Sequence, residues 1–155
     1  MLNVKGRSGL YAIIGFPLKH TASPAMHNAA FKFFNIDSFY VPVELEPCNL
    51  RDFFAAVRII FRGLNVTVPH KESVIPFLDT IGKHAEAMNS VNTIKVVRGA
   101  LKGFNTDFIG LREALKSAFN LTLKKKKICI LGAGGAAASE VYLGCILYTS
   151  DPADE

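Results

Sequence analysis

The chain alternates short apolar segments rich in β-branched residues with longer segments whose apolar residues recur at helical spacing. The short segments predict strands over residues 10–15, 38–43 and 63–68, and the longer ones predict helices over 24–34 and 50–61. Strands separated by helices pair in parallel, because each helix returns the chain to the end of the sheet where it began. The pattern predicts an α/β fold with a mostly parallel open sheet flanked by helices.

The sequence after the third strand predicts smaller elements. They are two helical stretches, a β-hairpin and a closing helix, over 70–77, 83–88, 90–104 and 108–119. Asp79-Thr80 is expected to form a turn between the two helical stretches. Arg98-Gly99 is expected to form the turn of the hairpin, which is predicted to lie at the far edge of the sheet.

A glycine-rich turn follows the last apolar segment. The predicted strand over 128–131 runs into Gly132, Ala133, Gly134, Gly135 and Ala136. Glycines at such a turn let backbone amides and a helix N-terminus approach a pyrophosphate, so these residues are candidate dinucleotide-binding residues at the start of a Rossmann domain. A tight turn of this kind also serves packing alone, and this alternative stays open.

These patterns divide the chain into three parts. Residues 1–106 form the first domain, and residues 107–143 form a linker helix and the truncated start of the Rossmann domain. Residues 144–155 do not continue the helix expected after the glycines, and they resemble a translated sequencing-library adapter. We interpret them as a non-native tail.

Composition narrows the classes of function. Half of the 155 residues are hydrophobic, but Lys, Arg, Pro or Gly interrupts each apolar run before the ~20 residues that a membrane span needs. The net charge of +5 comes largely from one lysine run rather than a distributed basic face, and the three cysteines form no C-x-x-C pair. We expect a cytoplasmic protein with no metal and no nucleic-acid or membrane partner.

Polar residues gather where the predicted strands end. Thr21 and Ser23 lie between the first strand and its helix, where two hydroxyls suit a carboxylate. In the alternative interpretation, Ser23 is the N-cap before Pro24 and Thr21 faces water.

A second polar group follows the third strand and flanks the hairpin. Asn65 and Thr67 share one face of the strand, and Lys71 stands at a helix start, where its ammonium group can exchange a proton with a substrate. Asn92 and Asp107 belong to two later polar clusters, and Asp107 is a candidate acidic partner of Lys71. The alternative is an ordinary exposed lysine among turn and capping residues.

Five segments in this order resemble the successive signatures of shikimate dehydrogenase. They are G-F-P-L-K-H-T-A-S-P-A-M-H-N, N-V-T-V-P-H-K, N-S-V-N-T, N-T-D and L-G-A-G-G-A-A. The match covers residues 10–140. The resemblance implies an oxidoreductase that reversibly reduces 3-dehydroshikimate to shikimate with NADPH, in aromatic amino acid biosynthesis.

The resemblance also implies roles for single residues. Thr21 and Ser23 would bind the substrate carboxylate, while Thr67, Asn92 and Asp107 would contact the substrate hydroxyls. Lys71 and Asp107 would form the catalytic pair, and Gly132 to Ala136 would bind NADP.

The sequence departs from the family pattern in several places. Thr21, His70 and Phe108 stand where the family more often has Ser, Phe and Gly, and the rest of the NADP domain with its late glutamine is absent. We therefore expect the chain to be inactive alone. Three alternatives stay open: a quinate/shikimate dehydrogenase that uses NAD, a non-catalytic carboxylate-binding module of the same fold, and a packing-only domain. A homodimer also stays open.

Overall fold

The computed structural model describes residues 6–119, 129 and 141–142. The elements are β1 (Gly9–Gly15), α1 (Ser23–Phe33), β2 (Ser38–Glu44), η1 (Pro47–Asn49), α2 (Leu50–Ile60), β3 (Gly63–Val66), α3 (His70–Ser73), η2 (Ile75–Phe77), β4 (Thr80–Ile81), α4 (Lys83–Ala87), β5 (Thr93–Val97), β6 (Ala100–Phe104) and α5 (Asp107–Phe119). Within the described residues, no helix is long and apolar enough to cross a membrane.

The six strands form one sheet in the order β2-β1-β3-β5-β6-β4. The strand β1 pairs in parallel with β2 and β3, and β4 pairs in parallel with β6, whereas β5 is antiparallel to both of its neighbours. All strands except β5 therefore run in one direction. This confirms the predicted α/β fold with a mostly parallel sheet, and the predicted Rossmann segment lies outside the described residues.

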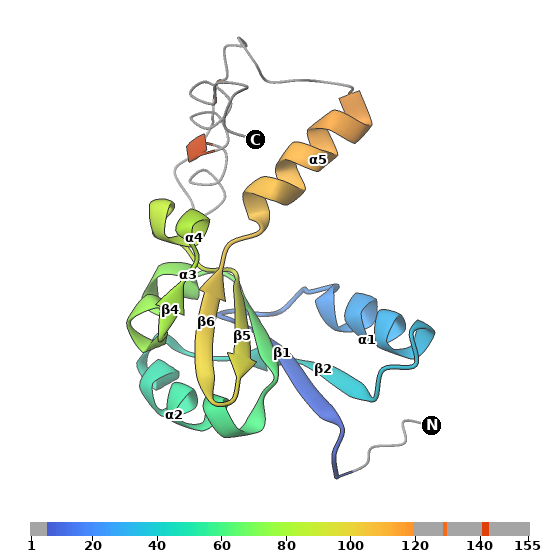
Figure 1. Ribbon diagram of the computed structural model, residues 1–155, viewed down its shortest axis with the longest axis vertical. Helices are drawn as coiled ribbons and strands as arrows, with labels where there is room; N and C mark the ends of the chain where they lie inside the picture. Colours follow the sequence, from blue (N-terminus) through green and yellow to red (C-terminus); the bar gives the residue numbers. More distant parts are fainter. Residues whose placement is uncertain (1–5, 120–128, 130–140, 143–155) are drawn as a thin grey trace.

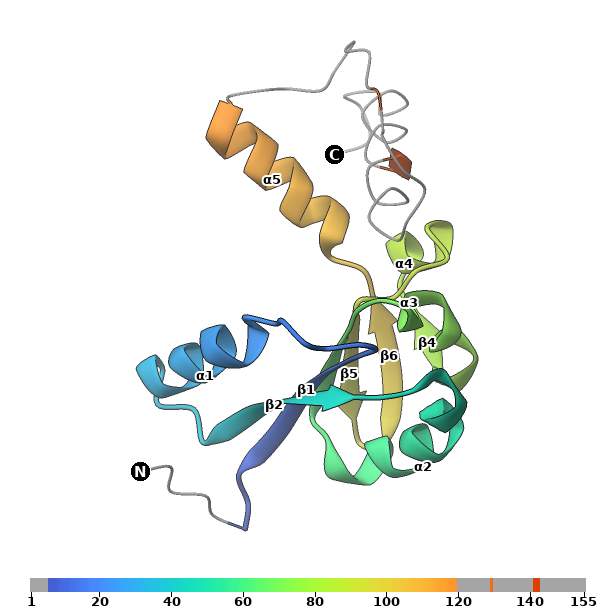
Figure 2. The ribbon, with the colours of Figure 1, turned by 180° about the vertical axis from the view of Figure 1, so that it is seen from behind.

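Helices cover both faces of this sheet. In Figures 1 and 2, α1 and α2 lie on opposite sides of the strands. The core lies on the α2 side, because alternate residues of the central strands, such as Ile14 and Val66, point there and pack with Phe54 and Val57 of α2. All four of these side chains are at most 3% exposed.

The other face is only partly covered. None of the residues of α1 is buried, and Phe33, one of the apolar residues that predict this helix, is 82% exposed. The helix contacts the sheet through other residues: Phe31 lies against Tyr11, and Asn28 exchanges two hydrogen bonds with the backbone of Tyr40. The spacing predicts the helix correctly, but its apolar stripe is not its buried face.

The hairpin turn adopts the conformation that its sequence favours. Arg98 and Gly99 have φ values of 51° and 80°, as in the two-residue turns that match the twist of paired strands. However, the expected position of the hairpin at the edge of the sheet is wrong. Thr80, expected in a turn, begins β4, which pairs with β6 and forms the edge itself.

An ion pair holds this edge in place. Asp79 accepts hydrogen bonds from the guanidinium of Arg58 on α2 and, at 2.6 Å, from the backbone N–H of Leu101. Arg58 also donates to the carbonyl of Gly99 at 2.8 Å. The hydrogen bond from Arg58, followed by that from Leu101, lowers the pKa of Asp79.

Asp79→Asn should therefore destabilise the fold at neutral pH more than in acid. A depressed pKa in the folded state contributes stability above the unfolded value of about 4, and this contribution is lost as the pH falls through the folded pKa. The urea midpoints of the variant and the original chain, measured at pH 7 and near pH 3, should differ clearly at pH 7 and converge in acid. A difference that stays constant with pH would contradict this account.

Candidate active site

The predicted polar clusters meet at the edge of the sheet formed by the C-terminal ends of the parallel strands, not at the edge strand β4. Ile14 of β1 pairs with Val66 of β3, while Thr93 of β5 pairs with both Asn65 and Phe104. The strands β1, β3 and β6 therefore end where β5 begins. The segments that follow β3 and β6, together with the segment that precedes β5, lie side by side.

The structure brings Lys71 and Asp107 into direct contact. The Lys71 Nζ atom lies 2.6 Å from Asp107 Oδ2, and the two side chains are 17% and 33% exposed. Asn92, which is buried, donates from Nδ2 to the other carboxylate oxygen at 2.6 Å. Each oxygen of Asp107 thus faces a donor.

The backbone around this pair is held by buried groups. Asn105, which is 4% exposed, accepts a hydrogen bond from the Asp107 N–H at 2.9 Å and donates to the carbonyl of Ser90 at the same distance. The Lys71 carbonyl accepts from the N–H of Val91 at 2.8 Å. The backbones of Lys71 and Asp107 are therefore both tied to the same short segment before β5.

The residue before Lys71 anchors its helix. His70 is fully buried, and its Nε2 atom donates to the carbonyl of Leu45, 2.7 Å away. This contact ties α3 to the segment after β2. The departure from the family pattern at His70 therefore acts on packing.

The three hydroxyl candidates line a common cavity of about 410 Å³. The residues around it are Ile13, Phe16, Pro17, Leu18, His20, Thr21, Ala22, Ser23, Thr67 and Val68. No acidic side chain is among these described residues, whereas three hydroxyl groups and one imidazole are. Neutral donors around a cavity without carboxylates suit an anionic group such as a carboxylate.

The expectation that Ser23 caps the helix is wrong. Ala22 already has helical dihedrals, φ −84° and ψ −10°, so α1 begins at Ser23 itself and no side chain caps it. The N–H of Ser23 donates instead to the Thr21 hydroxyl, 3.3 Å away. The Ser23 hydroxyl is therefore not used in capping and lines the cavity.

The cavity and the ion pair are neighbours but not one space. Lys71, Asn92 and Asp107 are not among the described residues that line the cavity. Thr67 connects the two regions, because it lines the cavity and its carbonyl accepts the N–H of His70, next to Lys71. The structure thus forms two groups, Thr21 with Ser23 and Thr67, and Lys71 with Asn92 and Asp107, at the same edge of the sheet.

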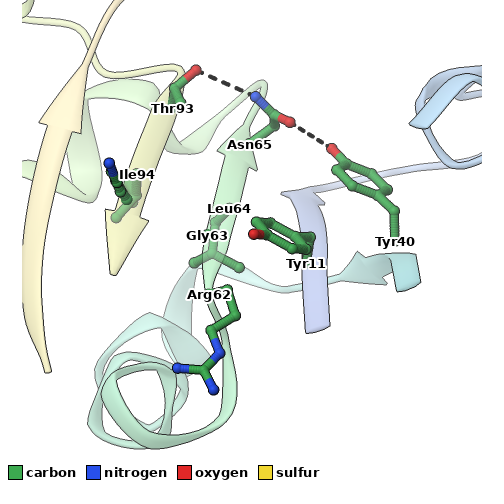
Figure 3. A pocket seen from close by; sticks show the side chains of 9 residues that line it. Tyr11, Tyr40, Arg62, Gly63, Leu64, Asn65, Thr93 and Ile94 are labelled. Atoms are coloured by element: carbon green, nitrogen blue, oxygen red, sulfur yellow. Dashed lines mark hydrogen bonds between the residues drawn. The ribbon is translucent and has the colours of Figure 1, made fainter. Parts of the chain in front are cut away.

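Tyr40 and Thr93 belong to this region, although the sequence did not single them out. Tyr40 is 4% exposed and donates to Asn65 Oδ1 at 2.7 Å, and Asn65 donates in turn to the Thr93 hydroxyl at 3.3 Å (Figure 3). Burial raises the pKa of Tyr40 to about 12, against the lowering effect of a hydrogen bond with the Ser23 side chain. No local motif marks Tyr40, whereas Thr93 closes the N-S-V-N-T cluster.

The close approach of Gly15 to Thr67 can be tested. A Cβ atom at Gly15 would lie 2.5 Å from Thr67 Cγ2 and 3.0 Å from the carbonyl oxygen of Val68. Gly15→Ala should displace Thr67, weaken the binding of a carboxylate ligand in the cavity and cost about 1–3 kcal/mol of unfolding free energy. Gly110→Ala is the control, since nothing lies within 4 Å there. Calorimetric titration measures the ligand affinity, and urea unfolding measures the free energy of unfolding. Equal values of both quantities in the two variants would refute the clash.

Several predicted features lie outside the described residues. Gly132 to Ala136, the candidate cofactor-binding residues, are among them, as is the segment 144–155. The domain boundary after residue 106 stays a prediction. Within the described part of the chain, no group of three or more His, Cys, Asp or Glu side chains is placed to hold a metal ion.

Comparison with known proteins places this site in a family. Residues 13–94 match the family described as the shikimate dehydrogenase substrate binding domain. The chain belongs to this family. The matched segment contains the strand ends that carry the cavity, together with Lys71 and Asn92.

Individual relatives agree with this assignment. The shikimate dehydrogenase (NADP(+)) of Carboxydothermus hydrogenoformans is 44% identical over 142 residues, which are 91% of this chain and 50% of the relative. The crystal structure of shikimate dehydrogenase from Aquifex aeolicus superposes with a TM-score of 0.89 at 37% identity, covering 94% of this chain and 55% of that one.

A third relative was solved with ligands bound. The shikimate 5-dehydrogenase of Thermus thermophilus, in complex with NADP(H) and shikimate, superposes with a TM-score of 0.82 at 36% identity. The match covers 88% of this chain and 52% of that one. The chain spans about half the length of the relatives that it matches.

Proposed function

We propose that this chain is the substrate-binding and proton-transferring part of a shikimate dehydrogenase, which reversibly reduces 3-dehydroshikimate to shikimate with NADPH. The observation that carries the proposal is the contact of 2.6 Å between Lys71 and Asp107 at the sheet edge that also carries the cavity. A protein that only binds a carboxylate has less need of a half-buried proton-transfer pair.

The cavity would take the carboxylate end of the substrate. The hydroxyls of Thr21 and Ser23 supply donors, and no carboxylate of the described lining residues opposes the negative charge. Thr67 lies on the side of the cavity nearer to α3, so a ring bound by its carboxylate would direct its hydroxyls towards Thr67 and the ion pair.

The ion pair would carry the proton. During reduction, Lys71 donates a proton to the carbonyl oxygen, and in the reverse direction it accepts the proton of the hydroxyl. Asp107 orients the ammonium group and accepts a hydrogen bond from the substrate, while Asn92 holds the second carboxylate oxygen. NADPH supplies the hydride to the carbon atom when it is bound. The assignment of Gly132 to Ala136 to its binding stays a prediction.

The wider setting follows from the same assignment. We infer a cytoplasmic enzyme of aromatic amino acid biosynthesis, with a small-molecule substrate and without nucleic-acid or membrane partners. A homodimer stays a prediction. Binding of NADP rather than NAD is supported by the names of the relatives, since the Carboxydothermus protein is an NADP(+) enzyme.

The test is shikimate-dependent reduction of NADP⁺. Residues 1–140 would be joined to the cofactor domain of the Carboxydothermus relative, and NAD⁺ and quinate would be assayed in parallel. Turnover with shikimate and NADP⁺ supports the proposal, while a preference for NAD⁺ and quinate supports the rival dehydrogenase. A folded protein that binds shikimate without turnover would support a non-catalytic binding module. The 155-residue chain alone is expected to bind shikimate weakly and to show little or no turnover.

A further inference from the structure

A continuous series of hydrogen bonds runs from Tyr40 to the ion pair. From Tyr40 on β2 it passes through Asn65 at 2.7 Å and Thr93 at 3.3 Å, as Figure 3 shows. It continues from Thr93 to Asn92 at 2.9 Å, and from Asn92 to Asp107 at 2.6 Å. The side chains come from segments far apart in the sequence and meet only in the folded sheet.

One backbone group determines the direction of this series. The N–H of Thr106 donates to Asn92 Oδ1 at 3.1 Å, and a backbone N–H acts only as a donor. The oxygen of the Asn92 amide must therefore face Thr106. Its NH₂ group is left to face Asp107, which as a carboxylate only accepts.

The same argument fixes the remaining members. The Thr93 hydroxyl has one proton and donates it to Asn92 Oδ1, so it can only accept from Asn65 Nδ2. The oxygen of Asn65 then faces Tyr40, whose hydroxyl donates to it. Every donor in the series points towards Asp107, and Tyr40 offers only lone pairs to the Ser23 hydroxyl beside it.

We propose that Tyr40 and Thr93 are positioning residues, whose hydroxyls hold the Asn92 amide in the orientation that the Thr106 N–H selects. Without this support, the Asn92 NH₂ group would be held less firmly against Asp107 Oδ1, and the carboxylate would be held less firmly beside Lys71. This proposal rests on the proposed function, because the ion pair matters for turnover only if it transfers the proton. It adds two residues to those that position the ion pair, and neither of them contacts Lys71.

The first test observes the amide itself in the full chain without ligand. Thr93→Val removes the hydroxyl and keeps the shape of the side chain, whereas Thr93→Ser keeps the hydroxyl. In ¹⁵N spectra, Thr93→Val and Tyr40→Phe should shift the side-chain NH₂ signals of Asn92, and Thr93→Ser should leave them near their original positions. Unchanged Asn92 signals in Thr93→Val and Tyr40→Phe would overturn the proposal.

The matched control is Tyr11→Phe. Tyr11 lines the same cavity of about 290 Å³ as Tyr40, Asn65 and Thr93 (Figure 3), but its hydroxyl makes no hydrogen bond with another residue in the described part of the chain. Loss of this hydroxyl should leave the Asn92 signals in place. Equal shifts in Tyr11→Phe and Tyr40→Phe would overturn the proposal, because they would show a general response of this face.

The second test separates positioning from simple destabilisation. The completed enzyme is residues 1–140 joined to the cofactor domain of the Carboxydothermus relative. In this enzyme, Thr93→Val and Tyr40→Phe should lower kcat about tenfold, which is the effect of losing one hydrogen bond to a charged network. The KM for shikimate should change only about twofold. Thr93→Ser and Tyr11→Phe should retain kcat. Equal kcat values for Thr93→Val and Thr93→Ser would overturn the proposal. An inactive wild-type enzyme would refute the proposed function instead, and the spectra of the ligand-free chain would still decide the orientation of Asn92.

Discussion

Lys71→Ala is expected to lower the kcat of the completed enzyme by about 10²- to 10⁴-fold, the usual contribution of a positioned general acid or base. The side chain is only 17% exposed and makes its contact with Asp107, so alanine removes the proton donor without disturbing the cavity. Shikimate affinity, measured by calorimetry on the same variant, should stay within about threefold. Such a division between turnover and binding identifies an interaction that acts in the transition state.

Lys83→Ala is the matched control for this experiment. Lys83 is an exposed lysine at the first position of α4, another short helix that leads into the same segment before β5. Its loss should leave kcat and shikimate affinity unchanged. Comparable losses of turnover in both variants would exclude a specific role of Lys71. Loss of shikimate binding in Lys71→Ala alone would show that Lys71 acts in binding rather than in proton transfer.

The sequence predicts the regular elements of this fold because their periodicity is strong. The strand around Ile14 is a continuous apolar run, as expected for a strand near the middle of a sheet. The two-residue strand β4 has no such pattern. It exists because the N–H groups of Asp79 and Gly82 bond to carbonyls of the hairpin, a contact that no local sequence reveals.

The candidate site is predictable to the extent that topology brings strand ends together. Polar residues that follow parallel strands, such as Thr67, Lys71 and Asp107, must meet at one edge, and the structure places them there. The series through Tyr40 is different. Tyr40 lies inside an apolar strand and reaches a partner 25 residues away, so its role depends on sheet register rather than on a motif.

The start of α1 shows a further limit of local patterns. The sequence Ser-Pro at positions 23 and 24 is typical of an N-cap followed by the first helical residue. In the structure Ala22 is already helical, and the Thr21 hydroxyl accepts the N–H of Ser23. A hydroxyl two residues earlier therefore satisfies the backbone, and Ser23 is available to the cavity.

Phe54→Ala should be the most destabilising of the substitutions considered, at about 3–5 kcal/mol, because it leaves a cavity in the core between α2 and the sheet. Phe54 is 3% exposed and stacks on Phe77 with ring centroids 5.0 Å apart. Phe33→Ala is the control, since this ring on α1 is 82% exposed and its loss should cost less than about 0.5 kcal/mol. Urea unfolding of both variants measures the difference. Because a domain of this size is stable by only about 5–15 kcal/mol, Phe54→Ala should remove a large fraction of its stability, and equal midpoints for the two variants would contradict the assignment of the core to the α2 face.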